Sequence, residues 1–396
     1  MALSCVFAFT SCVDNQEQKL GFGELPTFDL QKEYPLKRVV LQDVADVEYI
    51  PLETKKEALI LGLPMIKMDD KTIIIPNMRA GEILLFNHKG KHLNTFCRKG
   101  ESGEEYRSIA NMSADFTKKE IYIGDYSRSD NCYIKIYSFE GEFLRSLKMP
   151  KTMLFDLFDY DKDYLFGDEH LHVDVNRNEK VNHTPYYLIS KQTGELKQLP
   201  LYIENRVRNV LKYSKDIDKE NVLSFFLNYP VYPISKSGDR IIISDFGIDT
   251  VFTYANNQLT PIALVTNRTT EYPSTIMSGL DVLTDSILIL RTEDKRLLKP
   301  ETYTVPDPQQ LFYNRRSGEL NQVQFDDANG IPAEDANVFL GMGYYELPSH
   351  CALMYYKPEL LLEKYESGKL KGELKQIASK LKEDDNPVLV LVKFKK

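Results

Sequence analysis

The feature that most constrains this chain is a returning unit of two apolar segments joined by a glycine turn. Residues 83–96 (ILLFNHKGKHLNTF) and 134–147 (IKIYSFEGEFLRSL) share this pattern, with Gly90 and Gly141 at the turn. A weaker copy places Gly194 a similar distance further on. Strand-built repeats of about 50 residues are typical of β-propellers, in which each blade holds about four strands.

Apolar segments of this kind divide the chain into six blades, which begin near residues 64, 109, 153, 229, 275 and 338. The last blade contains residues 352–356 and the strongly β-forming run 388–394 (VLVLVKF). Residues 36–54, which include RVVL (38–41) and VEYIPL (47–52), form a lone outer strand without a blade of its own. Strands from both chain ends in the last blade would close the ring and leave no open edge there. We therefore predict an all-β, six-bladed β-propeller closed by its two termini.

Two segments interrupt this pattern. Residues 203–227 have partial helical spacing and predict an insertion between the third and fourth blades. Residues 358–382 predict one amphipathic helix inserted in the last blade, because their apolar residues recur every three or four positions. These residues are Leu370, Leu374, Ile377 and Leu381. The simplest role for the helix is packing against the side of the propeller, and the alternative is binding a partner.

Charge and composition exclude some classes of function. The 396 residues carry 50 Lys and Arg against 58 Asp and Glu, a net charge of −8, and no basic stripe. An acidic surface repels phosphate backbones, so nucleic acid is not an expected partner. If Cys5 and Cys12 lie in an export region, three cysteines remain, which cannot all pair within one chain. We expect those three to be small buried hydrophobic residues.

The N-terminus resembles an export signal. Residues 1–12 are apolar and end in Phe-Thr-Ser-Cys, which is similar to a bacterial lipobox, with Cys12 as the acylated residue. The apolar run is short and lacks basic residues, which a translation start upstream would explain; the alternative is an unprocessed hydrophobic end. We expect a signal region over 1–12, a tether over 13–35 and the propeller over 36–396. Acyl chains would then hold the protein at the membrane, with its bulk in water.

Three short motifs carry a family resemblance. Residues 47–54 (VEYIPLET) resemble the opening of the six-bladed β-propeller lipoproteins of Bacteroidetes. Residues 100–106 (GESGEEY) resemble the Gly-x-Gly-Pro-Gly-Glu-Tyr loop of that family, and 383–388 (EDDNPV) resemble its closing element. The resemblance implies an exported lipoprotein of the cell envelope, in the periplasm or at the outer-membrane surface, with a propeller similar to NHL and TolB-type proteins. It implies no reaction and no catalytic residues.

The densest group of possible metal ligands lies in residues 168–174 (DEHLHVD). On a strand, His170, His172 and Asp174 would project from one face, and imidazole with carboxylate suits zinc or another divalent transition metal. The alternative is a solvated edge strand, because such polar alternation is also typical of one.

Residues 159–163 (DYDKD) imitate the start of a calcium-binding EF-hand loop. The glycine required at position six is Tyr164, and the glutamate required at position twelve is His170. We therefore reject calcium binding and predict an aspartate-rich hairpin turn.

The loop over residues 100–106 has two glycines but no Lys-Ser or Lys-Thr step that a phosphate-binding loop would need. We predict a structural turn between blades, with Glu105 among its motif residues. In this turn Gly100 and Gly103 adopt positive φ and Tyr106 docks on the core.

The sequence contains no Gly-x-Ser-x-Gly or His-Glu-x-x-His motif. The first hypothesis is therefore a non-enzymatic binding or scaffold lipoprotein that recognises a peptide, glycan or protein partner. The second is a metal-assisted hydrolase or lyase with its site in the propeller channel, supported by His170, His172 and Asp174 alone. Fold does not decide between these hypotheses.

Overall fold

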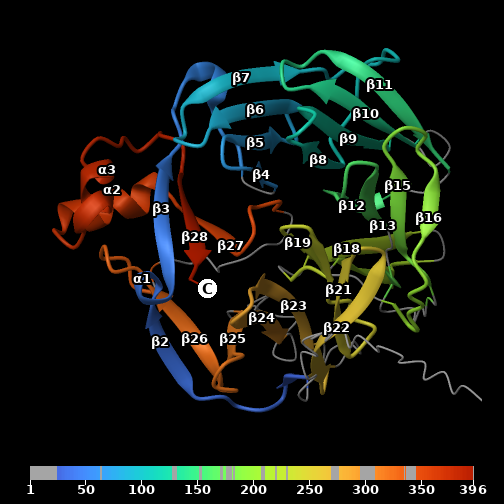
Figure 1. Cartoon of the computed structure of the whole chain (residues 1–396). Coiled ribbons are helices and arrows are strands. Elements are labelled where there is room, and N and C mark those ends of the chain that lie inside the picture. Colours follow the sequence, from blue (N-terminus) through green and yellow to red (C-terminus); the bar gives the residue numbers. More distant parts are fainter. Residues whose placement is uncertain are drawn as a thin grey trace, which may run out of the picture.

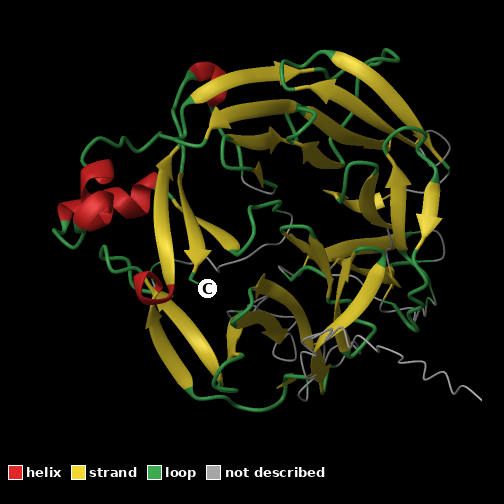
Figure 2. Ribbon diagram, in the orientation of Figure 1, coloured by secondary structure: helices red, strands yellow, loops and turns green. Residues whose placement is uncertain are grey.

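The computed structural model describes residues 25–395, apart from 63–64, 127–131, 151–153, 170–172, 175–180, 182, 207–209, 219–220, 229–230, 269–275, 295–307, 334 and 336–344. In the described part of the chain, six β-sheets are arranged around a central axis as the blades of a propeller (Figures 1 and 2). A small seventh sheet belongs to an insertion. The predicted all-β, six-bladed fold is confirmed.

Blades 1 to 3 are four-stranded antiparallel sheets in which the chain runs from the axis outwards (Figure 1). Blade 1 contains β4 (Lys67–Met68), β5 (Thr72–Asn77), β6 (Glu82–Asn87) and β7 (His92–Cys97). Blade 2 contains β8 (Asn111–Asp115), β9 (Glu120–Tyr126), β10 (Cys132–Ser138) and β11 (Phe143–Met149). Blade 3 contains β12 (Leu154–Asp159), β13 (Tyr164–Glu169), β15 (Tyr186–Ser190) and β16 (Leu196–Gln198).

Blades 4 and 5 each gain a fifth strand from the N-terminal region. Blade 4 contains β19 (Ile234–Ser237), β20 (Arg240–Ile243), β21 (Thr250–Ala255) and β22 (Gln258–Thr266). Blade 5 contains β23 (Ile276–Leu283), β24 (Ile287–Asp294), β25 (Gln309–Asn314) and β26 (Leu320–Asp326). On their outer edges, β1 (Thr27–Asp29) pairs in parallel with β22, and β2 (Leu36–Val40) pairs in parallel with β26. Because β1 lies within the range predicted as a tether, the propeller begins before residue 36.

Blade 6 is built from both ends of the chain. It contains β27 (Cys351–Tyr356), β28 (Val388–Phe394) and β3 (Ala45–Pro51), in that order from the axis outwards. The C-terminal strand β28 is antiparallel to β3 along its whole length, with Val388 opposite Pro51 and Phe394 opposite Ala45. Figure 1 shows blue β3 beside red β28. The predicted closure of the ring is therefore confirmed. The segment expected to form a single N-terminal strand forms two, of which β2 belongs to blade 5 and β3 belongs to blade 6.

Six apolar clusters form the core, one at each junction between neighbouring blades. A strand in the middle of a blade is covered on both faces, so its sequence is a continuous apolar run. Ile73, Ile74 and Ile75 of β5 illustrate this, because all three are fully buried. Outer strands such as β11 instead alternate between more and less exposed residues, because only one of their faces packs on a neighbouring blade.

The turn glycines of the repeat fulfil two steric requirements. Gly90, Gly141 and Gly194 have φ of +79°, +86° and +75°, a region in which side chains are strained. Each turn also lies against the outer strand of the preceding blade. A Cβ atom on Gly90 would lie 2.1 Å from the carbonyl oxygen of Pro51, and one on Gly141 would lie 2.5 Å from Cγ of Phe96. The repeat therefore marks a contact between blades as well as a turn.

The prediction of one helix over residues 358–382 was wrong in one respect. Two helices occur there, α2 (Pro358–Glu366) and α3 (Gly372–Ala378), and both lie outside the ring beside β3 (Figures 1 and 2). The chain turns between them at Gly368, where φ is +70°, a value that ends a helix. Leu370 and Leu374 are buried in the core between blades 5 and 6, so the predicted packing against the propeller is confirmed.

The insertion between blades 3 and 4 is confirmed, but it contains strands where the spacing indicated a partial helix. β17 (Val210–Asp216) and β18 (Val222–Asn228) form a hairpin, and β14 (Val173–Asp174) pairs in parallel with β17. The short helix α1 (Leu41–Val44) and the 3₁₀ helix η1 (Lys56–Ala58) flank β3. Within the described residues, the helices are too short and too polar to span a bilayer.

Closure by β28 predicts a large effect of truncation. Removing residues 388–396 should leave insoluble or molten protein, because β27 and β3 would each lose their partner strand and the cores on both sides of blade 6 would open. The measurement is urea unfolding followed by circular dichroism. The matched control removes residues 395–396, which takes away the hydrogen bonds that Lys395 donates to the carbonyl oxygens of Val44, Gln42 and Asp43 and leaves β28 whole. A cooperative unfolding transition in the longer truncation would contradict the closure argument.

Candidate functional site

Some predicted site residues lie outside the described part of the chain. These are Cys12, the predicted lipidation site, and His170 and His172 of the predicted metal site. Asp174 belongs to β14, where the backbone alone is described. Among the described residues, no group of three or more His, Cys, Asp or Glu side chains is placed to hold a metal ion.

The acidic residues that begin the predicted metal motif have other partners. Asp168 Oδ2 lies 2.7 Å from Nη2 of Arg206, and Glu169 Oε2 lies 2.6 Å from Nε2 of His183. Arg206 is fully buried between blades 3 and 4, and its Nε lies 3.2 Å from Asp245 Oδ2. A buried guanidinium requires such paired carboxylates, because an isolated charge in the core is costly. Asp168 in blade 3 and Asp245 in blade 4 therefore meet on Arg206, which belongs to the insertion between these blades.

The loop over residues 100–106 closes the junction between blades 1 and 2. Tyr106 is fully buried, where the sequence prediction placed it. Its hydroxyl donates a hydrogen bond to the carbonyl oxygen of Gly81 (2.7 Å) and accepts one from the backbone N–H of Arg98 (3.1 Å). The hydroxyl of Tyr137 from blade 2 donates to the carbonyl oxygen of Glu104 (2.7 Å). The loop thus contributes hydrogen bonds to both blades.

The glycines of this loop differ from the prediction. Neither Gly100 nor Gly103 has positive φ. A Cβ atom at Gly100 would lie 2.1 Å from Oε2 of Glu105, so a side chain there would displace that carboxylate. The Glu105 carboxylate folds back over the turn and accepts a hydrogen bond from the backbone N–H of Ser102 (2.9 Å). The turn is therefore shaped by a side-chain carboxylate and needs no left-handed residue at either glycine.

Charged residues meet at the axis of the propeller. The centre of this group is Glu346, which is 4 % exposed. Its Oε1 lies 3.1 Å from Nζ of Lys67 in blade 1 and accepts a hydrogen bond from the hydroxyl of Ser113 in blade 2 (2.7 Å). Its Oε2 lies 3.4 Å from Nζ of Lys236 in blade 4 and accepts from the backbone N–H of Asp159 in blade 3 (3.0 Å). One carboxylate therefore contacts four blades.

The same network continues outwards between blades 2 and 3. Asp159 Oδ2 lies 3.8 Å from Lys236 Nζ, and its Oδ1 lies 2.5 Å from Lys191 Nζ. Lys191 Nζ also lies 2.7 Å from Asp115 Oδ2 in blade 2. Lys191 comes from the turn after β15, so a residue at the rim of blade 3 reaches the network at the axis. We call the six residues Lys67, Asp115, Asp159, Lys191, Lys236 and Glu346 the axial network.

Burial and ion pairing have opposite effects on the acids of the axial network. Burial raises the pKa of Asp159 to about 6, although Lys236 and Lys191 oppose this rise. Burial alone would also raise the pKa of Glu346, but Lys67 and Lys236 more than offset it and hold that pKa below its ordinary value. Among the acids of the network, Asp159 therefore titrates closest to neutral pH, because the pKa values of Glu346 and Asp115 are lowered.

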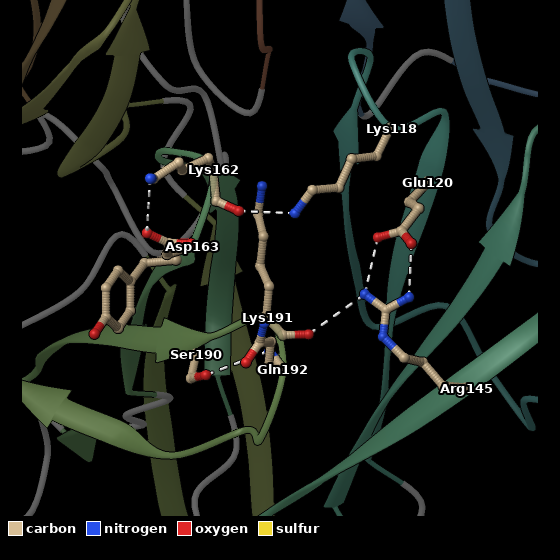
Figure 3. Close-up of a pocket in the computed structure, with 9 residues that line it drawn as sticks. Lys118, Glu120, Arg145, Lys162, Asp163, Ser190, Lys191 and Gln192 are labelled. Carbon is tan, nitrogen blue, oxygen red and sulfur yellow. Dashed lines mark hydrogen bonds and ion pairs between the residues drawn. The ribbon is translucent and has the colours of Figure 1, made fainter.

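A pocket of about 470 Å³ opens above this network, between blades 2 and 3 (Figure 3). Lys191 lies at its floor. On one wall the guanidinium of Arg145 donates to both carboxylate oxygens of Glu120, at 2.6 and 2.9 Å. Lys118 Nζ donates to the carbonyl oxygen of Lys162 across the pocket (2.8 Å), which links the hairpin turns of the two blades. The pocket is polar, rigidly framed and open to solvent, and it suits a small hydrophilic ligand.

A family model described as a domain of unknown function, DUF4934, matches residues 25–393. The chain belongs to the DUF4934 family. No curated protein matches this DUF4934 chain.

Two solved structures share the fold of this DUF4934 protein. A protein assigned as exported from Bacteroides fragilis NCTC 9343 has 12 % identity and a TM-score of 0.63, over 93 % of this chain and 99 % of that one. A member of the DUF4221 family from Bacteroides vulgatus ATCC 8482 has 11 % identity and a TM-score of 0.51, over 89 % and 97 %. At these identities the similarity shows the fold alone.

The axial network and the pocket were not predicted from the sequence, although two signals point to them. Lys67 stands between Ile66 and Met68, and a lysine within a short apolar strand suggests a buried ion pair. Asp115 and Asp159 each end the innermost strand of consecutive blades. Aligning the blades by their first strand, rather than by their turn glycines, would have placed both aspartates at the axis.

Tyr106→Phe should destabilise the DUF4934 propeller by about 1–3 kcal/mol, because it leaves the carbonyl of Gly81 and the N–H of Arg98 without the hydroxyl. The measurement is urea unfolding. Tyr202→Phe is the matched control, since that side chain is 57 % exposed. Equal free energies of unfolding for both variants would contradict the structural role of the loop.

Asp159 should make stability depend on pH. Its pKa is about 6 in the folded protein and near 3.8 when exposed, so the folded state holds the proton to higher pH than the unfolded chain. The stabilisation from this proton is full below pH 3.8 and is lost as the pH rises to about 6. Relative to Asp159→Asn, the wild type should lose roughly 3 kcal/mol of unfolding free energy between about pH 4 and pH 7.

The measurement is urea unfolding of wild type and variant across this pH range. Asp161→Asn is the control, because Asp161 is an exposed residue of the same hairpin turn and Asn can still accept its two backbone hydrogen bonds. A difference between wild type and Asp159→Asn that does not change with pH would contradict the burial argument.

Proposed function

We propose that this protein is a non-enzymatic binding module, exported and anchored to the cell envelope by a lipid on Cys12. We also propose that its propeller is similar to those of NHL and TolB-type proteins. The observation that carries it is the pocket between blades 2 and 3, a preformed recess on a rigid ring whose charged groups already neutralise one another in part. Such a site binds a ligand without supplying an activated group.

The described cysteine and histidine side chains support binding over catalysis. Burial raises the pKa of the Cys351 thiol to about 11, so it is protonated and poorly nucleophilic at neutral pH. Cys97 is exposed, with the carbonyl oxygen of Ala80 as a weak hydrogen-bond partner at 3.8 Å. His183 is oriented by Glu169 but lies apart from the pocket residues. This arrangement favours recognition of a peptide, glycan or protein partner.

Export is supported by the relatives. The Bacteroides fragilis structure that shares this fold is assigned as an exported protein, and the N-terminal sequence has the lipobox pattern. The first described strand, β1, begins at Thr27, so 14 residues (13–26) separate Cys12 from the propeller. A chain of that length holds the ring close to the membrane surface while leaving its faces in water.

The binding role is tested by the fate of the bound compound. Full-length protein is immobilised and incubated with peptide and glycan fractions of the cell envelope, and the retained compounds are eluted and weighed by mass spectrometry. We expect saturable retention and elution of compounds with unchanged mass. Cleaved or eliminated products would contradict the proposal and support a metal-assisted hydrolase or lyase, for which the His170→Ala/His172→Ala double variant should then lose both activity and bound metal.

Cys12→Ala should release the protein from the membrane, because acyl chains attach to that thiol and no described helix could replace them as an anchor. The measurement is the share of protein in the membrane pellet after fractionation, together with incorporation of labelled palmitate. Cys5→Ala is the matched control in the same N-terminal region. Equal membrane association of Cys12→Ala and wild type would contradict lipid anchoring.

A further inference from the structure

The pocket between blades 2 and 3 carries more basic than acidic groups, although the whole chain has a net charge of −8. Its charged lining residues are Lys118, Arg145, Lys162, Lys191, Glu120 and Asp163. Two other pockets have the opposite balance. One lies beside the loop over residues 100–106, and the other lies between residues 51–54 and α3. The local excess of positive charge is therefore a property of this pocket and not of the surface in general.

Two of the four cations are available to a ligand. Arg145 is held in a two-point contact by Glu120, and Lys191 is ion-paired at the floor. Lys118 and Lys162 each lie 3.9 Å from an acidic partner, near the outer limit of an ion pair. Lys118 Nζ donates one hydrogen bond to the carbonyl oxygen of Lys162 (2.8 Å), and an ammonium group has two further N–H donors for a ligand. Their side chains are 43 % and 86 % exposed. Figure 3 shows both beside the pocket, on turns from different blades.

We propose that this pocket binds an acidic saccharide, with its carboxylate held between Lys118 and Lys162. Hydroxyl groups of the sugar would meet Ser190 and Gln192, which line the same recess. Tyr164 also lines it and supplies aromatic surface, a kind of surface that can pack on the apolar face of a sugar ring. The volume of about 470 Å³ lies within the range of roughly 300–1,000 Å³ for small-ligand sites. This inference rests on the proposed binding function and specifies its ligand class.

Other anions fit this lining less well. Phosphate and sulfate are held best by a guanidinium fork, and the fork of Arg145 is already used by Glu120. Peptides are held by addition of a strand or by apolar anchors, but the walls here are hairpin turns with polar side chains. A sugar that presents a carboxylate beside many hydroxyls therefore matches the groups of the pocket most closely.

The test is calorimetric titration of the full-length protein with a trisaccharide of galacturonic acid. We expect binding that weakens roughly threefold in Lys162→Gln and roughly tenfold in the Lys118→Gln/Lys162→Gln double variant. Binding should also weaken as sodium chloride is raised, because both lysines are exposed enough to be screened. Lys375→Gln is the matched control, since it removes an exposed lysine from α3, on the opposite side of the ring (Figure 1).

Three further titrants separate the possible outcomes. Maltotriose, which is neutral, should bind at least tenfold more weakly than the acidic trisaccharide. Binding of triglutamate or inorganic phosphate as tight as that of the trisaccharide would overturn the saccharide inference and indicate a general anion site or a peptide site. Absence of trisaccharide binding, or equal binding by wild type and the double variant, would also overturn it. If envelope compounds are still retained unchanged in that case, the proposed binding function stands without this ligand.

Discussion

The pairing of β28 with β3 is the interaction on which the rest of the structure depends. Six apolar clusters form the core, and each lies between two blades. A blade is therefore buried on both faces only when it has a neighbour on each side, and an open arc of blades would leave two apolar faces in water. The seven residue pairs between β28 and β3 close the ring, so that both of these apolar faces become buried together. The helices α2 and α3 add to the same junction through Leu370 and Leu374.

Closure also explains the axial network. Inner strands converge on the axis, and side chains there must pack against all the other blades. Glu346 meets this requirement by accepting contacts from four blades, with Lys67 and Lys236 as its counter-ions. A buried pair gains little over apolar packing, but it specifies geometry when each member has more than one partner. Lys191 pairs with Asp159 of the axial network and also lines the floor of the pocket. The position of the pocket floor therefore depends on the ion pairs at the axis.

Local patterns in the sequence predicted the blades and missed the axis, for a physical reason. Continuous apolar runs and turn glycines depend on neighbours within one blade or the next, so they recur at a fixed spacing. Lys67 and Glu346 are partners from opposite ends of the chain. The apolar neighbours of Lys67 suggest that it is buried, but no repeat spacing identifies Glu346 as its partner. The helix prediction failed at Gly368, because the apolar stripe from Leu370 to Leu381 begins after this glycine and therefore describes α3 and not α2. The strands β17 and β18 have only seven residues each, too few for the alternation of a strand to be distinguished from the spacing of a helix.

The order in which the strands of blade 6 are synthesised affects how the protein folds. β3 leaves the ribosome among the first elements, whereas its partner β28 comes last, so this contact has a very large separation along the chain and must form late in folding. Until then, the hydrogen-bonding edge of β3 and the apolar sides of its neighbours stay uncovered and open to association with other chains. A holding chaperone that protects nascent β3 would therefore increase the yield of this protein more than one that acts on the finished ring.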